Sequence, residues 1–263
     1  MIEILICIIA GMLAGIGTGF AGMSAASFIT PVLVGFLDVP VYDAVGIALI
    51  SDVLASALST VIYKKAGNFD IRKAMPLMVG IVIFTILGSI LAYKISVTDV
   101  GNSVLGYWSI IAALGLGIHF ILHPVRKSRD VKRSHRGTGI GVVLLCSAYI
   151  GLICGFQGVG GGLMILFSLT VIMGYDFKIA VGTSVFIMTF TALIGGASHF
   201  VINGMPDMVM LITCCISTAV FAILAAHIAN RHSERFLGLC IGWILTIFGV
   251  ATLLLKLVNQ GIL

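Results

Sequence analysis

Long apolar stretches separated by short polar turns follow one another along almost the whole chain. The stretches suited to helices are residues 2–21, 25–37, 43–63, 75–94, 104–122, 138–156, 161–174, 178–202, 208–229 and 236–258. Most of them reach the roughly 20 residues that a helix needs to cross a bilayer. Two are shorter, 25–37 and 161–174, and we expect each to be a steep short span or the return arm of a re-entrant hairpin. The pattern predicts an all-α integral membrane protein.

Both short stretches follow a break in the apolar pattern that small residues produce. Residues 155–162 read Gly-Phe-Gln-Gly-Val-Gly-Gly-Gly, which places five glycines in eight positions. Each glycine costs a helix interior about 1 kcal/mol relative to alanine. Residues 19–26 read Gly-Phe-Ala-Gly-Met-Ser-Ala-Ala and form a weaker version of the same break. Non-helical backbone survives at membrane depth only where protein packs on it or where it lines a wet cavity. Transporters bind their substrates at such places.

The two breaks belong to an internal repeat. Aligned without gaps with positions 151–184, positions 15–48 share nine identities in 34, four of them glycines. A shift of one further position then aligns Gly67 with Gly204 and Asp70 with Asp207. The repeat predicts a first membrane half at 1–123, a linker at 124–136 and a second membrane half at 137–263. Each half holds five helical segments, so the chain has eight to ten spans.

Composition narrows the class of protein further. Only 10% of the residues are charged, against about 25% in a soluble domain, and the mean hydropathy is +1.20. We therefore expect no soluble catalytic domain, and we interpret the first stretch as a retained helix and not as a signal peptide. The six cysteines fall in apolar segments without metal-type spacing and are expected to pack as small hydrophobic residues. No catalytic triad, nucleotide loop or metal cluster is visible, so we predict neither an enzyme nor a cofactor.

The distribution of positive charge predicts the orientation of the chain. The linker 124–136 contains six Lys or Arg residues, the last of them Arg136, and one Asp. The positive-inside rule places this linker in the cytoplasm. If the two halves are inverted relative to each other, 13 of the 15 Lys and Arg residues fall on that side. A rival arrangement has eight spans and parallel halves, and it leaves Lys178, Arg231 and Arg235 outside. We favour inverted repeats in a multi-pass membrane protein.

Inverted halves would bring the two breaks together near the membrane midplane. Helix N-termini and free backbone N–H groups there attract anions without any Lys or Arg. The alternative is close helix packing through small residues. Gln157 lies inside the second break, where its amide would donate to an anion or cap free backbone groups. The candidate substrate-binding residues in the breaks are Gly22, Met23, Ser24, Ser27, Gln157, Gly158, Gly160, Gly161 and Gly162.

Four further polar residues lie in the apolar stretches outside the breaks. Thr183 and Ser184 follow Gly182 near the start of a predicted helix, and they either face the substrate or bond back to the preceding turn. Asp52 is the one acidic residue in the middle of a predicted span, which usually marks an ion or proton pathway. Its alternative is a neutral, hydrogen-bonded aspartic acid packed against Ser51, Ser56 or a neighbouring helix. His199 is either a proton relay or an interfacial anchor.

The ordered set of small residues resembles the TauE/SafE family of membrane proteins, the sulfite exporter type. In the second half the resemblance rests on the glycines of residues 155–162, on Ala-Val-Gly-Thr-Ser at 180–184 and on the Asn-Gly turn at 203–204. In the first half it rests on the glycines of residues 15–22, on Ala-Val-Gly at 44–46 and on Lys-Ala-Gly-Asn-Phe-Asp at 65–70. The first half departs from the family pattern at 23–26, at 46–48 and in having Asp52.

The resemblance implies a bacterial plasma-membrane transporter of small anions, often sulfur-bearing ones such as sulfite or sulfoacetate. We therefore expect a secondary transporter that exports sulfite or an organosulfonate by alternating access, with a proton or the membrane potential as driving force. The expected partners are the small anion, the lipid bilayer and, in a homo-oligomer, further copies of the chain, with no nucleic acid. The alternatives are an uptake carrier or channel for another small anion, and a membrane ligand sensor that transports nothing.

Overall fold

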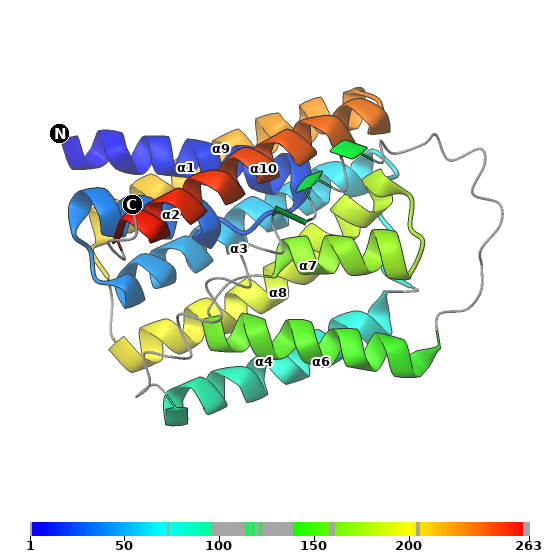
Figure 1. Ribbon diagram of the computed structural model, residues 1–263, viewed down its shortest axis with the longest axis horizontal. Coiled ribbons are helices and arrows are strands. Elements are labelled where there is room, and N and C mark those ends of the chain that lie inside the picture. Colours follow the sequence, from blue (N-terminus) through cyan, green and yellow to red (C-terminus); the bar gives the residue numbers. More distant parts are fainter. Residues whose placement is uncertain are drawn as a thin grey trace.

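A computed structural model describes residues 2–72, 74–95, 114–115, 117–118, 121–122, 139–157, 161–203 and 206–259. Over this part of the chain every regular element is a helix (Figure 1). The elements are α1 (Ile2–Ala21), α2 (Ala26–Leu37), α3 (Val41–Lys65), α4 (Met75–Ile95), α6 (Ile140–Gln157), α7 (Gly162–Phe167), the short π-helix η2 (Ser168–Ile172), α8 (Phe177–Asn203), α9 (Met208–Arg231) and α10 (Glu234–Asn259). The predicted all-α fold is confirmed. Most of the helix expected at 104–122, and the linker 124–136, lie outside the described residues.

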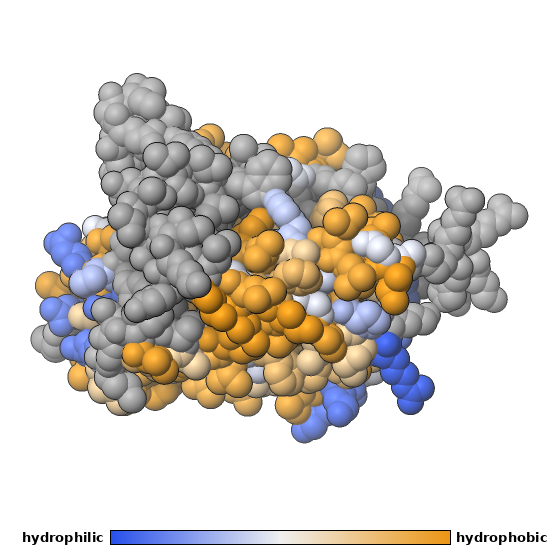
Figure 2. All heavy atoms as spheres, turned by 90° about the horizontal axis from the view of Figure 1, so that it is seen from below, coloured by the Kyte–Doolittle hydropathy of each residue, from blue (hydrophilic) through white to orange (hydrophobic). Residues whose placement is uncertain are grey.

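The surface of the molecule is apolar where that of a soluble protein would be polar. Figure 2 shows hydrophobic side chains over the middle of one face and hydrophilic ones toward its edges. On α9 an exposed stripe is formed by Ile212, Ile216, Val220 and Leu224, whereas the opposite face buries small residues against the core. Such a stripe fits a lipid environment and not water.

Five of the described helices are long and apolar enough to cross a membrane. They are Ile2–Ala21, Asp43–Lys65, Phe177–Ala197, Met208–Arg231 and Glu234–Ala251. The segments Ala26–Leu37 and Gly162–Ile172 are shorter apolar helices, as their sequence predicts. The chain is therefore a multi-pass membrane protein.

The internal repeat appears in the structure as equivalent turns. After α2 the backbone N–H of Val39 donates to the carbonyl of Leu33 at 3.3 Å, and after η2 that of Tyr175 donates to Leu169 at 2.8 Å. In the register that aligns Gly15 with Gly151, Tyr175 is the counterpart of Val39 and Leu169 that of Leu33. The two short helices thus end in the same way.

A second pair of turns follows the shifted register. The Asp70 carboxylate accepts a hydrogen bond from the backbone N–H of Arg72 at 3.0 Å. The Asp207 carboxylate accepts the corresponding bond from Val209 at 2.8 Å and caps α9. An aspartate that accepts from the backbone two residues later is a common start signal for a helix, and here it marks the same point of each repeat.

The first helix of each half packs against the fourth helix of the other half. Helix α1 lies along α9 and α6 lies along α4, while α3 and α8 contact each other between these pairs. A Cβ atom added at Gly15 would overlap the Thr218 carbonyl oxygen, and one added at Gly151 would lie 2.6 Å from the Ile81 carbonyl oxygen. Small residues of this kind let helix backbones approach closely in membranes. The reciprocal pairing places the breaks after α1 and α6 beside the central helices.

Candidate functional site

The two breaks in the helices meet. A Cβ atom added at Gly162, the first residue of α7, would overlap the carbonyl oxygen of Gly22 in the loop between α1 and α2. Gly22 and Gly161 both have a left-handed backbone, with φ of 63° and 65°. Only glycine adopts this conformation at little cost. Glycine is therefore required here both for the turns and for the contact between the two halves.

Hydrogen bonds from buried side chains hold the first break in place. The hydroxyl of Thr18 donates to the Met23 carbonyl at 2.8 Å, and the hydroxyl of Tyr63 donates to the Gly19 carbonyl at 2.9 Å. The Gly19 carbonyl lies in the last turn of α1 and the Met23 carbonyl in the loop after it, where helical partners are no longer available. Tyr63 is fully buried, so α3 fixes the end of α1 from within the core.

Asp52 reaches from α3 to the start of α2. Its carboxylate accepts a hydrogen bond from the Ser24 hydroxyl at 2.5 Å and another from the backbone N–H of Ala25 at 2.6 Å. The backbone N–H of Ala26 donates to the hydroxyl oxygen of Ser24 at 3.3 Å. Asp52 has no exposed surface and is the only charged residue among the described buried ones. The partners of the carboxylate therefore lie at the first break, next to the neighbouring helix α2, while Ser51 and Ser56 make other contacts.

Those neighbouring serines bond elsewhere and connect helices. The hydroxyl of Ser56 donates to the backbone carbonyl of Asp52 at 2.5 Å and lies 2.8 Å from the hydroxyl of Thr189 on α8. The hydroxyl of Ser51 lies 3.5 Å from the sulfur of Cys215 on α9. These contacts tie α3 to its two long neighbours, and so they stiffen the helix that carries Asp52.

In the second half, two hydroxyl groups lie beside the break on α8. The Ser184 hydroxyl bonds back to the Val181 carbonyl at 2.9 Å, and it would lie 2.7 Å from a Cβ atom at Gly22. The Thr183 hydroxyl lies 3.2 Å from both the backbone nitrogen and the carbonyl oxygen of Asp70. Ser184 therefore contacts the paired breaks, whereas Thr183 holds the turn between α3 and α4.

The same turn lies close to the end of the second short helix. Burial raises the pKa of the Tyr175 phenol, and the nearby Asp70 carboxylate raises it further. In the described part of the chain the buried hydroxyl of Tyr175 has no hydrogen-bond partner. Asn68 in this turn donates to the side-chain oxygen of Asn230 near the end of α9 at 2.6 Å, and Lys178 donates to the Asn230 carbonyl at 3.0 Å. Polar contacts thus gather at one end of the central helices.

The structure brings together the break residues of both halves that it describes. Met23 is buried beside Gly22, Ser24 bonds to Asp52, and Ser27 is partly buried at the second position of α2. The predicted residues that lie outside the described part are Gly158 and Gly160, together with the side chains of Gln157 and His199.

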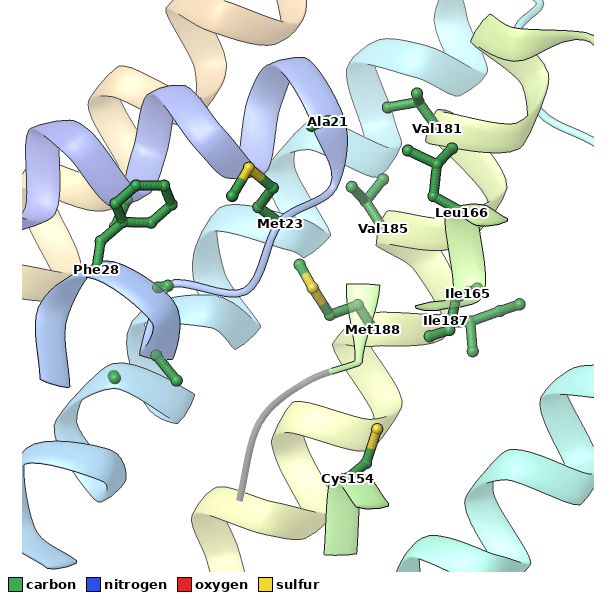
Figure 3. Packing of buried hydrophobic residues seen from close by; sticks show 14 of the residues in the cluster. Ala21, Met23, Phe28, Cys154, Ile165, Leu166, Val181, Val185, Ile187 and Met188 are labelled. Carbon is green, nitrogen blue, oxygen red and sulfur yellow. The ribbon is translucent and has the colours of Figure 1, made fainter. Parts of the chain in front are cut away.

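Two groups of site residues escaped the sequence analysis. Met188 on α8 lies next to Gly162, with its sulfur 2.8 Å from a Cβ atom added there, and Figure 3 shows its side chain directed toward the loop between α1 and α2. Thr18 bonds to that loop at Met23, and Tyr63 bonds to the last turn of α1 at Gly19. The sequence could have indicated Met188 through the internal repeat, because the register of the repeat aligns it with Asp52.

The fold and these paired, glycine-dependent breaks define a multi-pass helical membrane protein with a duplicated interrupted helix. A family model described as sulfite exporter TauE/SafE matches residues 7–252. The chain belongs to the TauE/SafE family of membrane transporters, and it is accordingly a transporter and not an enzyme.

Two curated relatives from Bacillus subtilis (strain 168) agree with this assignment. The probable membrane transporter protein YunE is 23% identical over 209 residues, which cover 73% of this chain and 73% of the relative. The probable membrane transporter protein YdhB is 23% identical over 230 residues, which cover 86% of this chain and 90% of the relative. No solved structure matches the chain significantly.

Proposed function

We infer that the protein is a secondary transporter of a small anion, held where the two breaks meet and moved by alternating access. The contact between Gly22 and Gly162 carries this proposal. It brings two interrupted helices face to face in the interior of a membrane protein, an arrangement that transporters use for midplane substrate sites.

The chemistry at the meeting point suits an anion bound by dipoles. The continuous helical segment Gly162–Ile172 starts at the contact, and the positive end of its dipole favours negative charge. Ser184 supplies a hydroxyl beside it, whose proton would turn from the Val181 carbonyl to the anion. Gln157, Gly158, Gly160 and Gly161 complete the proposed site in the second half, and Gly22, Met23, Ser24 and Ser27 border it from the first. We assign Thr183 an indirect part through the turn at Asp70.

A sulfur oxyanion is the substrate class that we favour. The matching family model carries the words sulfite exporter, and sulfite or an organosulfonate offers several oxygens to backbone N–H groups. Export is the direction that fits a family of this description. The alternatives are uptake or channel-type passage of another small anion, and ligand sensing without transport.

The arrangement of the halves fits alternating access. The fourth helix of each half packs against the first helix of the other half, so two equivalent helix pairs flank the central helices α3 and α8. In our proposal the halves are inverted in the membrane, the linker 124–136 is cytoplasmic and the membrane is the plasma membrane. Inverted halves let the same packing open first on one side and then on the other.

The driving force is a proton gradient or the membrane potential. Asp52 is our first candidate for a coupled proton, because a buried carboxyl group in a span can exchange its charge during the cycle. His199 is the second candidate, by its imidazole chemistry.

Reconstituted transport tests this function. Purified protein in liposomes would be given sulfite, sulfoacetate, sulfate, taurine and chloride, each with and without a pH gradient, and flux would be compared with that of protein-free liposomes. We expect saturable flux of one sulfur oxyanion and little flux of chloride. Saturable chloride flux would favour the other-anion alternative, and binding without flux would favour the sensor.

A further inference from the structure

The two halves place different side chains at the same point of the repeat. Asp52 of α3 and Met188 of α8 are counterparts in the register that also relates α2 to α7. The carboxylate of Asp52 accepts from the backbone N–H of Ala25, the residue directly before α2. Met188 lies against Gly162, which corresponds to Ala26. The two side chains thus occupy equivalent places at equivalent helix starts.

Their chemistry is opposite. At the start of α2 the Ser24 hydroxyl and the backbone N–H of Ala25 donate to a carboxylate, and donors of this kind are what proteins offer to a small oxyanion. The thioether of Met188 brings no negative charge to the corresponding backbone at Gly161 and Gly162. One half therefore carries an anion of its own, and the other half has an apolar side chain at that position.

We propose that Asp52 is a tethered anion, a positioning residue that fills the anion site of the first half and leaves the second half alone to take the substrate. The pocket at the start of α2 would accept formate, acetate or a similar small oxyanion if the carboxylate were removed. The Asp52 side chain fills this pocket whether it is protonated or ionised, so its role as a pocket-filling residue does not depend on proton coupling. One substrate anion then binds per chain. The assignment of the substrate to the second half rests on the proposed function, whereas the latent pocket at α2 does not.

The latent pocket is tested by refilling it. Asp52→Ala in detergent should unfold at a lower temperature than the unaltered protein, and formate should raise its unfolding midpoint in a saturable way. Two controls should show no such rise. Asp52→Asn keeps the pocket filled, and Leu49→Ala opens an apolar cavity in the same helix, where Leu49 is also buried. A formate response equal in all four proteins, or absent from folded Asp52→Ala, would overturn the proposal.

A second variant tests the proposal even if Asp52→Ala does not fold. Met188→Asp places a second tethered carboxylate at the start of α7, and Met188→Asn adds similar polarity without the charge. We expect substrate binding to folded Met188→Asp to be at least about tenfold weaker than to Met188→Asn, because like charges compete for the same donors. Equal binding by the two variants would contradict the proposal. If the unaltered protein binds none of the tested anions, the proposed function fails, and the formate experiment still decides the latent pocket.

Discussion

The carbonyl oxygen of Gly22 lies against the α-carbon of Gly162, so the two interrupted helices touch through bare backbone. The contact joins the first half of the chain to the second and lies where α1, α7 and α8 come together. A side chain of any size at Gly162 would separate the two halves at the place where we locate the substrate.

Gly162→Ala is therefore expected to impair the protein. The added methyl group overlaps the Gly22 carbonyl, and overpacking of this kind costs about 1–3 kcal/mol. We expect a lower unfolding temperature in detergent and a loss of anion flux. Gly35→Ala in α2 is the matched control, because nothing lies within 4 Å of a Cβ atom there, and it should leave both measurements close to those of the unaltered protein. Equal behaviour of the two variants would remove the significance that we give to the contact.

Gly15 and Gly151 should respond alike to substitution. Gly15→Leu pushes α1 away from α9, and Gly151→Leu pushes α6 away from α4. Because the two contacts are equivalent in the repeat, both variants should lower the unfolding temperature by a similar amount. A large effect at one position only would show that the two helix pairs are not equivalent in the folded protein.

Asp52→Asn separates proton coupling from purely structural roles of the carboxylate. Asparagine keeps the size and one acceptor oxygen but cannot take up and release a proton at physiological pH. If Asp52 carries the coupled proton, the variant still transports down an anion gradient, but its flux no longer responds to a pH gradient. Flux that keeps its pH response in the variant assigns the coupling to another group.

Thr183→Val tests the link between α8 and the turn after α3. The hydroxyl contacts both backbone groups of Asp70, and its loss should lower the free energy of unfolding by about 1 kcal/mol. Thr183→Ser keeps the hydroxyl and is the control. If Thr183 instead contacts the substrate, Thr183→Val would weaken anion binding and leave the unfolding temperature unchanged.

Tyr175→Phe is expected to stabilise the protein. The buried hydroxyl has no partner in the described part of the chain, and an unpaired buried polar group costs about 1–3 kcal/mol. Phenylalanine removes that group and keeps the ring, so the unfolding temperature in detergent should rise. A lower unfolding temperature of the variant would contradict this expectation and would show that the Tyr175 hydroxyl has a hydrogen-bond partner in the purified protein.

The apolar pattern predicted most helices closely, because a membrane-spanning helix can be recognised from its length and its apolar composition. The small-residue breaks also indicated where α2 and α7 begin, and their repeat suggested that Gly22 and Gly162 approach each other. The sequence singled out Ser24 and Asp52 separately. Their hydrogen bond joins residues 28 positions apart, and only the packing of α3 against the break brings them together.

Two other relationships depend on tertiary packing in the same way. The bond between Thr183 and Asp70 spans 113 residues, so the hydroxyl pattern near Gly182 could not reveal its partner. The packing of the first helix of each half against the fourth helix of the other half could not be predicted either, because an internal repeat is compatible with several ways of pairing the copies. The importance of Met188 could be found only by comparing it with Asp52 across the repeat.

Anion flux in liposomes tests the central claim most directly when the unaltered protein is compared with the double variant Gln157→Ala/Ser184→Ala. We predict saturable transport of a sulfur oxyanion by the unaltered protein, and its loss in a double variant that remains folded. Transport that survives in the folded double variant would contradict the proposed site. If the unaltered, folded protein transports none of the tested anions, the proposed substrate class is contradicted.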